Sequence, residues 1–102
     1  MAKKVVWTLA AWNDLETVAD FISQDSPYYA AAWVRNVRDA ARSLTLMAMR
    51  GRVVPEIGDE QIRELIIQNY RLVYKVERSR VAVLGVIHGA RDLKTLWVRK
   101  AR

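Results

Sequence analysis

The sequence predicts an α+β protein in which a helical hairpin packs on one face of a mainly antiparallel, twisted sheet, in a two-layer arrangement. Three observations lead to this fold class. A short run rich in β-branched residues opens the chain, two stretches with apolar residues every three or four positions follow, and three strand-like runs separated by short turns come next. With 102 residues, the chain suffices for one core, so we expect a single domain over residues 1–102.

The N-terminal half is expected to hold one strand and two helices. Lys3–Leu9 reads as the strand, and apolar residues at helical spacing over Trp12–Ile22 mark the first helix. Ser26 is a good N-cap and Pro27 suits the first helical position, so a second helix should start there. Gly51 is placed to end it. Two adjacent amphipathic helices joined by a short turn predict an antiparallel hairpin.

The C-terminal half is expected to form a β-meander. After a glycine- and proline-containing loop, "GRVVPEIGDEQ", come three candidate strands at Ile62–Gln68, Tyr70–Glu77 and Arg80–His88. Short turns between them favour antiparallel pairing, which gives the order β-α-α-β-β-β. The tail, residues 92–102, fits either a helix or a further strand, and its conformation and role stay open.

Charge and composition narrow the class of partner. Lys and Arg outnumber Asp and Glu by 17 to 11, a net charge of +6, which favours an anionic partner such as nucleic acid or an acidic protein. The absence of cysteine removes disulfides and thiolate metal sites, and we expect neither a metal nor a cofactor. Without a signal peptide or an apolar segment of about 20 residues, we expect a cytoplasmic protein with no membrane contact.

Basic side chains in the last strands form the first candidate site. If the turn at Arg78-Ser79 has two residues, Val73 lies opposite Leu84 and Arg71 lies opposite Val86. Arg71 and His88 would then share the sheet face away from the helices. The predicted basic surface consists of Arg63, Arg71, His88 and Arg91.

Such a surface would suit phosphate or carboxylate, because arginine offers a planar pair of donors and histidine exchanges protons near neutral pH. The structural alternative is that these arginines pair with a local acid, Glu56 or Glu64, and that His88 is a hydrogen-bonding residue at a strand end.

Several segments in order resemble the ParE/RelE superfamily of type II toxin–antitoxin toxins, also called plasmid stabilisation proteins. They are "AAWNDLETVADFI", "DSPYYAAAWV", "GRVVPE", "IRELIIQNYRLVYKV" and "VLGVIHGAR", spread over about residues 5–92. The set is closer to the ParE branch than to RelE. The resemblance implies a toxin neutralised by a co-expressed antitoxin of the ParD kind, whose C-terminal segment folds onto it.

Two activities occur in the superfamily: RelE-like members cut mRNA on the ribosome, and ParE-like members poison DNA gyrase. Arg71, His88 and Glu56 match parts of the ribonuclease machinery, but His88 is followed by Gly89 and Ala90, and no tyrosine follows Tyr74. The expected function is therefore gyrase poisoning by binding, with no catalytic residues. The alternatives are a ribosome-dependent mRNA endonuclease and a degenerate, non-toxic partner-binding domain.

The aromatic residues divide into packing and contact candidates. Trp7, Trp12 and Trp33 fall at core-facing positions and are expected to pack. Tyr28 and Tyr29 lie near the turn of the hairpin and are the candidate antitoxin-binding residues.

Overall fold

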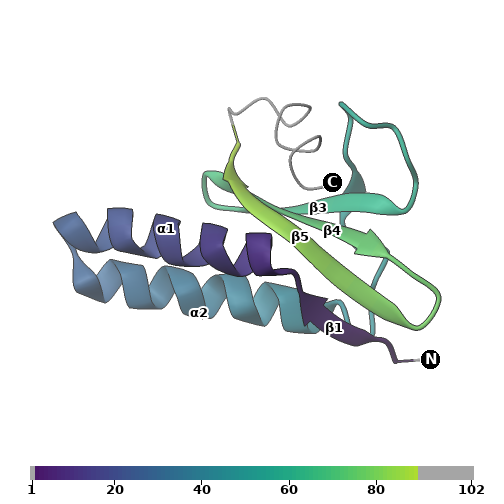
Figure 1. Ribbon diagram of the computed structural model, residues 1–102, viewed down its shortest axis with the longest axis horizontal. Helices are drawn as coiled ribbons and strands as arrows, with labels where there is room; N and C mark the ends of the chain where they lie inside the picture. The colour runs from purple at the N-terminus through teal and green to yellow at the C-terminus, as the bar shows by residue number, and fades with distance from the viewer. Residues whose placement is uncertain (1, 90–102) are drawn as a thin grey trace.

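The helical hairpin lies against one face of a twisted sheet (Figure 1). The computed structural model describes residues 2–89. The elements in chain order are β1 (Lys4–Trp7), α1 (Leu9–Asp25), α2 (Pro27–Ser43), β2 (Arg52–Val53), β3 (Ile62–Ile67), β4 (Tyr70–Val76) and β5 (Arg80–His88). The sheet is five-stranded with the order β1-β5-β4-β3-β2, and only the β1–β5 pair is parallel. The α+β prediction and the meander of the last three strands are confirmed.

Both helices start at the residues that local chemistry dictates. The Thr8 hydroxyl accepts a hydrogen bond from the Ala11 N–H at 3.1 Å and caps α1. Ser26 caps α2 in the same way, with its hydroxyl 3.2 Å from the Tyr29 N–H, and Pro27 occupies the first turn as predicted. Each cap satisfies a backbone donor that has no partner within its helix.

The end of α2 differs from the sequence-based prediction. The helix stops at Ser43 rather than near Gly51, and Leu44 turns inward and is fully buried. The Lys3 N–H donates to the Thr45 carbonyl at 2.9 Å, which joins the segment after α2 to the start of β1. Gly51 serves another purpose. A Cβ atom there would lie 2.6 Å from the Glu64 carbonyl oxygen, so the position has no room for a side chain.

The segment after Gly51, which was predicted as a loop, contains the short strand β2. Its two residues pair with β3, Arg52 opposite Glu64 and Val53 opposite Arg63. This edge pairing brings Arg52 onto the same sheet face as Glu64.

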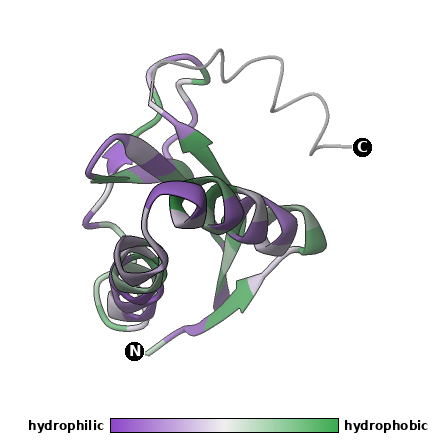
Figure 2. Cartoon of the chain, turned by 90° about the vertical axis from the view of Figure 1, so that its left-hand side faces the viewer, coloured by the Kyte–Doolittle hydropathy of each residue, from purple (hydrophilic) through white to green (hydrophobic). Residues whose placement is uncertain are grey.

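The main core lies between the hairpin and the sheet. Its buried members come from α1, α2, β3, β4 and β5, with Leu44 after α2: Ala11, Leu15, Trp33, Val37, Ala41, Leu44, Leu65, Leu72, Tyr74, Val81, Val83 and Val86. In Figure 2 the strands are coloured largely as hydrophobic, whereas both helices also carry hydrophilic residues. This arrangement is expected for a sheet face buried under two amphipathic helices.

The other face of the sheet, on which Arg71 was expected, is not bare. Val54, Ile62, Val73 and Ile87 form a second buried apolar cluster, with Ile57 packed against it. We call this side the outer face. Val54 and Ile57 come from the segment between β2 and β3, so this connection covers part of the outer face.

A β-bulge shifts the register between β4 and β5. Tyr74 pairs with Val83, but Val73 pairs with Gly85, so Leu84 is the extra residue and the predicted Val73–Leu84 pair is wrong. Beyond the bulge Arg71 lies opposite Ile87 and Tyr70 opposite His88. One inserted residue exchanges the two faces for the remainder of β5.

Candidate functional site

Arg71 lies on the outer face and is enclosed by acceptors. Its Nη1 atom is 2.9 Å from Glu56 Oε2 and 3.2 Å from Glu64 Oε1. Its Nε and Nη2 atoms donate to the Gly89 carbonyl at 3.2 and 2.9 Å. Arg52 completes the group, with its Nε 2.6 Å from Glu64 Oε2. We call Arg52, Glu56, Glu64 and Arg71 the Arg71 cluster.

The cluster is electrically balanced and partly buried. The Glu64 side chain is 0% exposed and that of Arg71 only 11%, so the charge of each needs its neighbours. The hydrogen bond from Arg71 lowers the pKa of Glu56, against the opposing effect of burial. The same bond is the main reason why the pKa of Arg71 is raised. Two arginines and two carboxylates give the Arg71 cluster no net charge.

His88 lies on the opposite side of the sheet from Arg71, which contradicts the predicted basic surface. It pairs with Tyr70, which belongs to the helix-facing set, and their rings meet edge to face at 5.5 Å. The ring of Tyr70 in turn contacts buried Trp33 at 5.2 Å. The β-bulge is the physical reason, because it moves His88 to the helix side while Arg71 stays on the outer face.

Arg63 is also on the helix-facing side, opposite Tyr74. Its Nη1 donates to the Gly51 carbonyl at 2.9 Å and its Nε to the Glu60 carbonyl at 2.9 Å, so it secures the connections on either side of β2. Arg91, like the tail 92–102, lies outside the described residues. Among the described members of the predicted basic surface, Arg71 is therefore separated by the sheet from both Arg63 and His88. The alternative, pairing of arginine with Glu56 and Glu64, is confirmed for Arg71.

Two of the three tryptophans that were expected to pack do so. Trp33 is buried and Trp7 packs against the core. Trp12 was expected to pack, but it is 40% exposed and meets the Trp7 ring edge to face at 5.2 Å. Tyr28 and Tyr29 are 74% and 67% exposed at the start of α2, and their rings contact each other at 5.6 Å.

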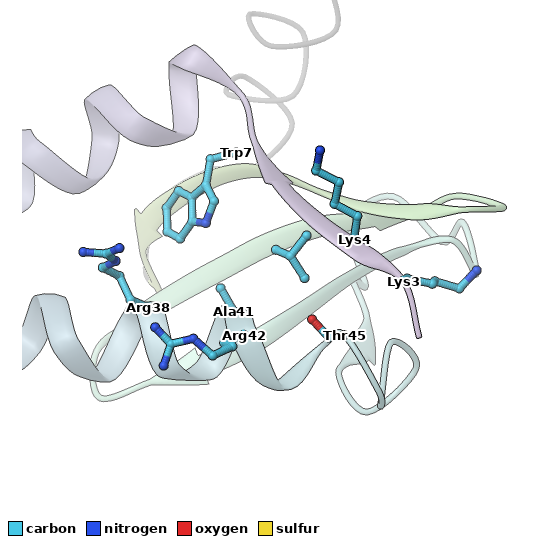
Figure 3. A pocket seen from close by; sticks show the side chains of 8 residues that line it. Lys3, Lys4, Trp7, Arg38, Ala41, Arg42 and Thr45 are labelled. Atoms are coloured by element: carbon cyan, nitrogen blue, oxygen red, sulfur yellow. The ribbon is translucent and has the colours of Figure 1, made fainter. Parts of the chain in front are cut away.

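One feature escaped the sequence-based search. Basic residues at the start of the chain and on α2 line a common hollow, because β1 lies beside the second half of α2 (Figure 3). The spacing of Arg35, Arg38 and Arg42 along a helix was visible in the sequence. That Lys3 and Lys4 come to the same place depends on the parallel pairing of β1 with β5, which carried no local signal.

Over residues 2–89, no three His, Asp or Glu side chains come together in a way that could hold a metal ion. Neither α1 nor α2 is long and apolar enough to cross a membrane.

Solved structures share this architecture. The chain superposes on a chain of the chromosomal ParDE toxin–antitoxin system from P. aeruginosa with a TM-score of 0.71 and 19% identity, covering 85% of this chain and 96% of that one. A chain of the toxin–antitoxin complex RelBE2 from Mycobacterium tuberculosis gives a TM-score of 0.61 at 22% identity, covering 86% of this chain and 99% of that one. A hairpin on a five-stranded mixed sheet therefore defines a ParE/RelE-like fold.

Sequence comparison identifies the family. Residues 5–93 match the family described as the ParE toxin of the type II toxin–antitoxin system parDE. The chain is also 34% identical over 89 residues to Toxin RelE2 of Caulobacter vibrioides, covering 86% of this chain and 97% of that protein. The chain belongs to the ParE toxin family, and its role is that of a type II toxin.

Proposed function

We propose that this toxin acts in the cytoplasm by binding DNA gyrase and trapping its cleaved complex with DNA, and that a ParD-like antitoxin neutralises it. The observation that carries the proposal is the state of Arg71. Its guanidinium is bonded to two carboxylates and the Gly89 carbonyl, while His88 lies across the sheet. The groups that a ribonuclease would need are not assembled around one substrate position.

The chemistry of RNA cleavage explains why this arrangement counts against a nuclease. A base, an acid and a cation must all reach the same phosphodiester. Here the candidate cation, Arg71, and the candidate base, Glu56, are bonded to each other. The lowered pKa of Glu56 also makes its carboxylate a weaker base than an ordinary glutamate. Binding without catalysis is the simpler function for this surface.

The test is a gyrase reaction with purified protein, ATP and supercoiled plasmid. The proposal predicts gyrase-linked, linearised plasmid after denaturation of the enzyme, and no linear plasmid when gyrase is omitted. Primer extension on translated mRNA, with wild-type protein and His88→Ala, provides the comparison. New RNA ends that depend on His88 would establish the ribosome-dependent endonuclease instead. Normal supercoiling, intact mRNA and normal growth without antitoxin would indicate a non-toxic partner-binding domain.

We also propose that the antitoxin docks at the tip of the hairpin. Tyr28 and Tyr29 are exposed there, and Phe21 is 64% exposed one turn before the end of α1. Aromatic side chains exposed together are typical of protein contacts, and the net charge of +6 favours an acidic partner.

Alanine at both tyrosines tests this docking site in binding assays with the purified antitoxin. Contact residues of this kind are each worth more than about 1 kcal/mol, so affinity should fall at least about tenfold. Leu46→Ala is the matched control, because Leu46 is 79% exposed but follows the other end of α2. Equal affinity of the tyrosine variant and the control would place the antitoxin elsewhere.

A further inference from the structure

A hollow of about 380 Å³ lies between β1 and the second half of α2. Figure 3 shows side chains from both elements around it. Its lining residues are Lys3, Lys4, Val5, Trp7, Arg38, Ala41, Arg42 and Thr45. A second hollow of about 300 Å³ continues along α2 and shares Arg38 and Arg42 with the first. We call the two together the β1–α2 groove.

The groove is basic along its α2 wall. Arg35, Arg38 and Arg42 lie there with one carboxylate, Asp39, which is bonded to Arg42 at 3.1 Å. Three minus one leaves +2 on this wall. At the β1 end, the Lys3 Nζ donates to the Glu77 and Arg78 carbonyls at 2.8 and 2.6 Å, and Figure 3 shows the Lys4 side chain directed away from the arginines.

Flat aromatic rings accompany the cations. Trp7 lines the groove, and the ring of Trp12 meets it at 5.2 Å with 62° between the ring planes. The Arg38 guanidinium carbon lies 6.0 Å from the centre of the Trp12 ring, so this ring adjoins the groove and is 40% exposed. A large aromatic side chain left partly in water beside a cation is a surface on which a planar base can stack.

Together these features discriminate among anionic ligands. An acidic peptide would use the cations but has no planar group for an exposed indole. A duplex presents its phosphates, but its bases are already stacked on each other. Single-stranded nucleic acid offers both phosphates and free base faces, which is the combination that basic grooves with aromatic platforms bind.

We propose that the β1–α2 groove binds single-stranded nucleic acid without sequence preference, with Arg35, Arg38 and Arg42 facing phosphates and Trp12 stacking on a base. This function goes beyond gyrase poisoning and does not require it. The test below contains no gyrase, so its outcome is separate from that of the gyrase reaction.

The experiment measures binding of the purified protein to a labelled oligodeoxythymidine of about 12 nucleotides by fluorescence anisotropy at several salt concentrations. Stacking of one base is worth about 1–3 kcal/mol, so Trp12→Leu should weaken binding roughly 5- to 150-fold. Trp12→Phe keeps a flat ring and should retain most of the affinity. Each variant is first shown to fold by its unfolding midpoint.

Charge is tested with a matched pair. Arg38→Gln removes one proposed phosphate contact and should reduce the salt slope by about 0.7. Lys75→Gln removes the same charge from the outer face, where Lys75 lies opposite Ile62 and Ala82, and should leave the slope unchanged. Equal losses for these two variants would mean that net charge alone attracts the strand and would overturn the proposal.

Two competing ligands complete the test. A duplex of the same length and a poly-glutamate peptide of similar charge should both bind at least about tenfold more weakly than the single strand, because neither offers a free base. If the peptide binds as tightly, the groove is a site for an acidic protein segment. If the duplex binds as tightly, stacking on Trp12 plays no part. Either result would refute the assignment.

Discussion

Removing the Arg71 guanidinium alone should destabilise the protein more than removing it together with Glu64. The perturbations are Arg71→Met, Glu64→Leu and the double variant, which form a thermodynamic cycle. In Arg71→Met, the fully buried Glu64 carboxylate loses one of its two arginine partners and keeps only Arg52, whose side chain is 60% exposed. A buried charge with too few partners is costly, whereas apolar residues of similar size fit the site.

The expected losses in the free energy of unfolding follow from how deeply each charge is buried. Breaking a buried ion pair costs about 3–5 kcal/mol, and because Arg52 remains, we expect about 3 kcal/mol for Arg71→Met. Glu64→Leu should cost about 2 kcal/mol, since Arg71 keeps Glu56 and the Gly89 carbonyl. The double variant leaves only the more exposed Arg52 and Glu56 without their partners, so it should cost about 1–2 kcal/mol. The coupling free energy is then about 3–4 kcal/mol.

Urea unfolding followed by circular dichroism measures each corner of the cycle. With a typical slope of about 1–3 kcal/mol per molar urea, Arg71→Met should lower the midpoint by about 1–3 M. Additivity within about 0.5 kcal/mol would show that Arg71 and Glu64 do not depend on each other. A cost below about 1 kcal/mol for Arg71→Met would refute the structural role of this side chain.

Other positions give further predictions. Tyr74→Phe should cost about 1–3 kcal/mol in thermal or urea unfolding, because the buried hydroxyl accepts from the Gly51 N–H at 3.0 Å and donates to a backbone carbonyl. Burial raises the pKa of Tyr74, so the free energy of unfolding should fall as pH rises above about 10. This fall should be smaller in Tyr74→Phe, which lacks the hydroxyl. Gly51→Ala should cost about 1–3 kcal/mol, since its Cβ would meet backbone at 2.6 Å. Gln68→Gly should stabilise by about 0.5–1 kcal/mol, because Gln68 has a φ of 56°. Arg71 lowers the pKa of Glu56 below 4.5, so the contribution of the Arg71–Glu56 pair to the free energy of unfolding should be lost as pH falls below that value. Acid unfolding of Arg71→Met should lack this component of the pH dependence.

Local chemistry made much of the fold predictable from the sequence. The caps at Ser26 and Pro27 and the helical spacing of apolar residues fixed the hairpin, and short turns fixed the meander. The bulge at Leu84 was missed although Gly85 follows it directly, because a glycine inside a strand indicates that a bulge can form there but does not identify which residue is the extra one. That single residue decided which face His88 occupies.

Of the candidate site, only the pairing of Arg71 with nearby acidic residues could be predicted from the sequence. Glu56 and Glu64 could be named as partners of Arg71 because the chain offers few acids near these strands. The burial of the Glu64 side chain could not be predicted. It depends on Arg52, which lies in the short strand β2, and the sequence predicted that segment to be a loop. The β1–α2 groove was missed for a related reason, since it requires β1 to lie beside α2, and that placement depends on the parallel pairing of β1 with β5.

The central claim is that the toxin inhibits gyrase by binding and without catalysis. The most direct test is to measure how gyrase inhibition depends on the amount of toxin. Plasmid supercoiling would be measured over a range of toxin-to-gyrase ratios and incubation times. The account predicts that activity is lost only as toxin approaches gyrase in molar amount, with a midpoint that does not move with time. Progressive inactivation by trace amounts of toxin, or unchanged supercoiling at a large excess, would contradict it.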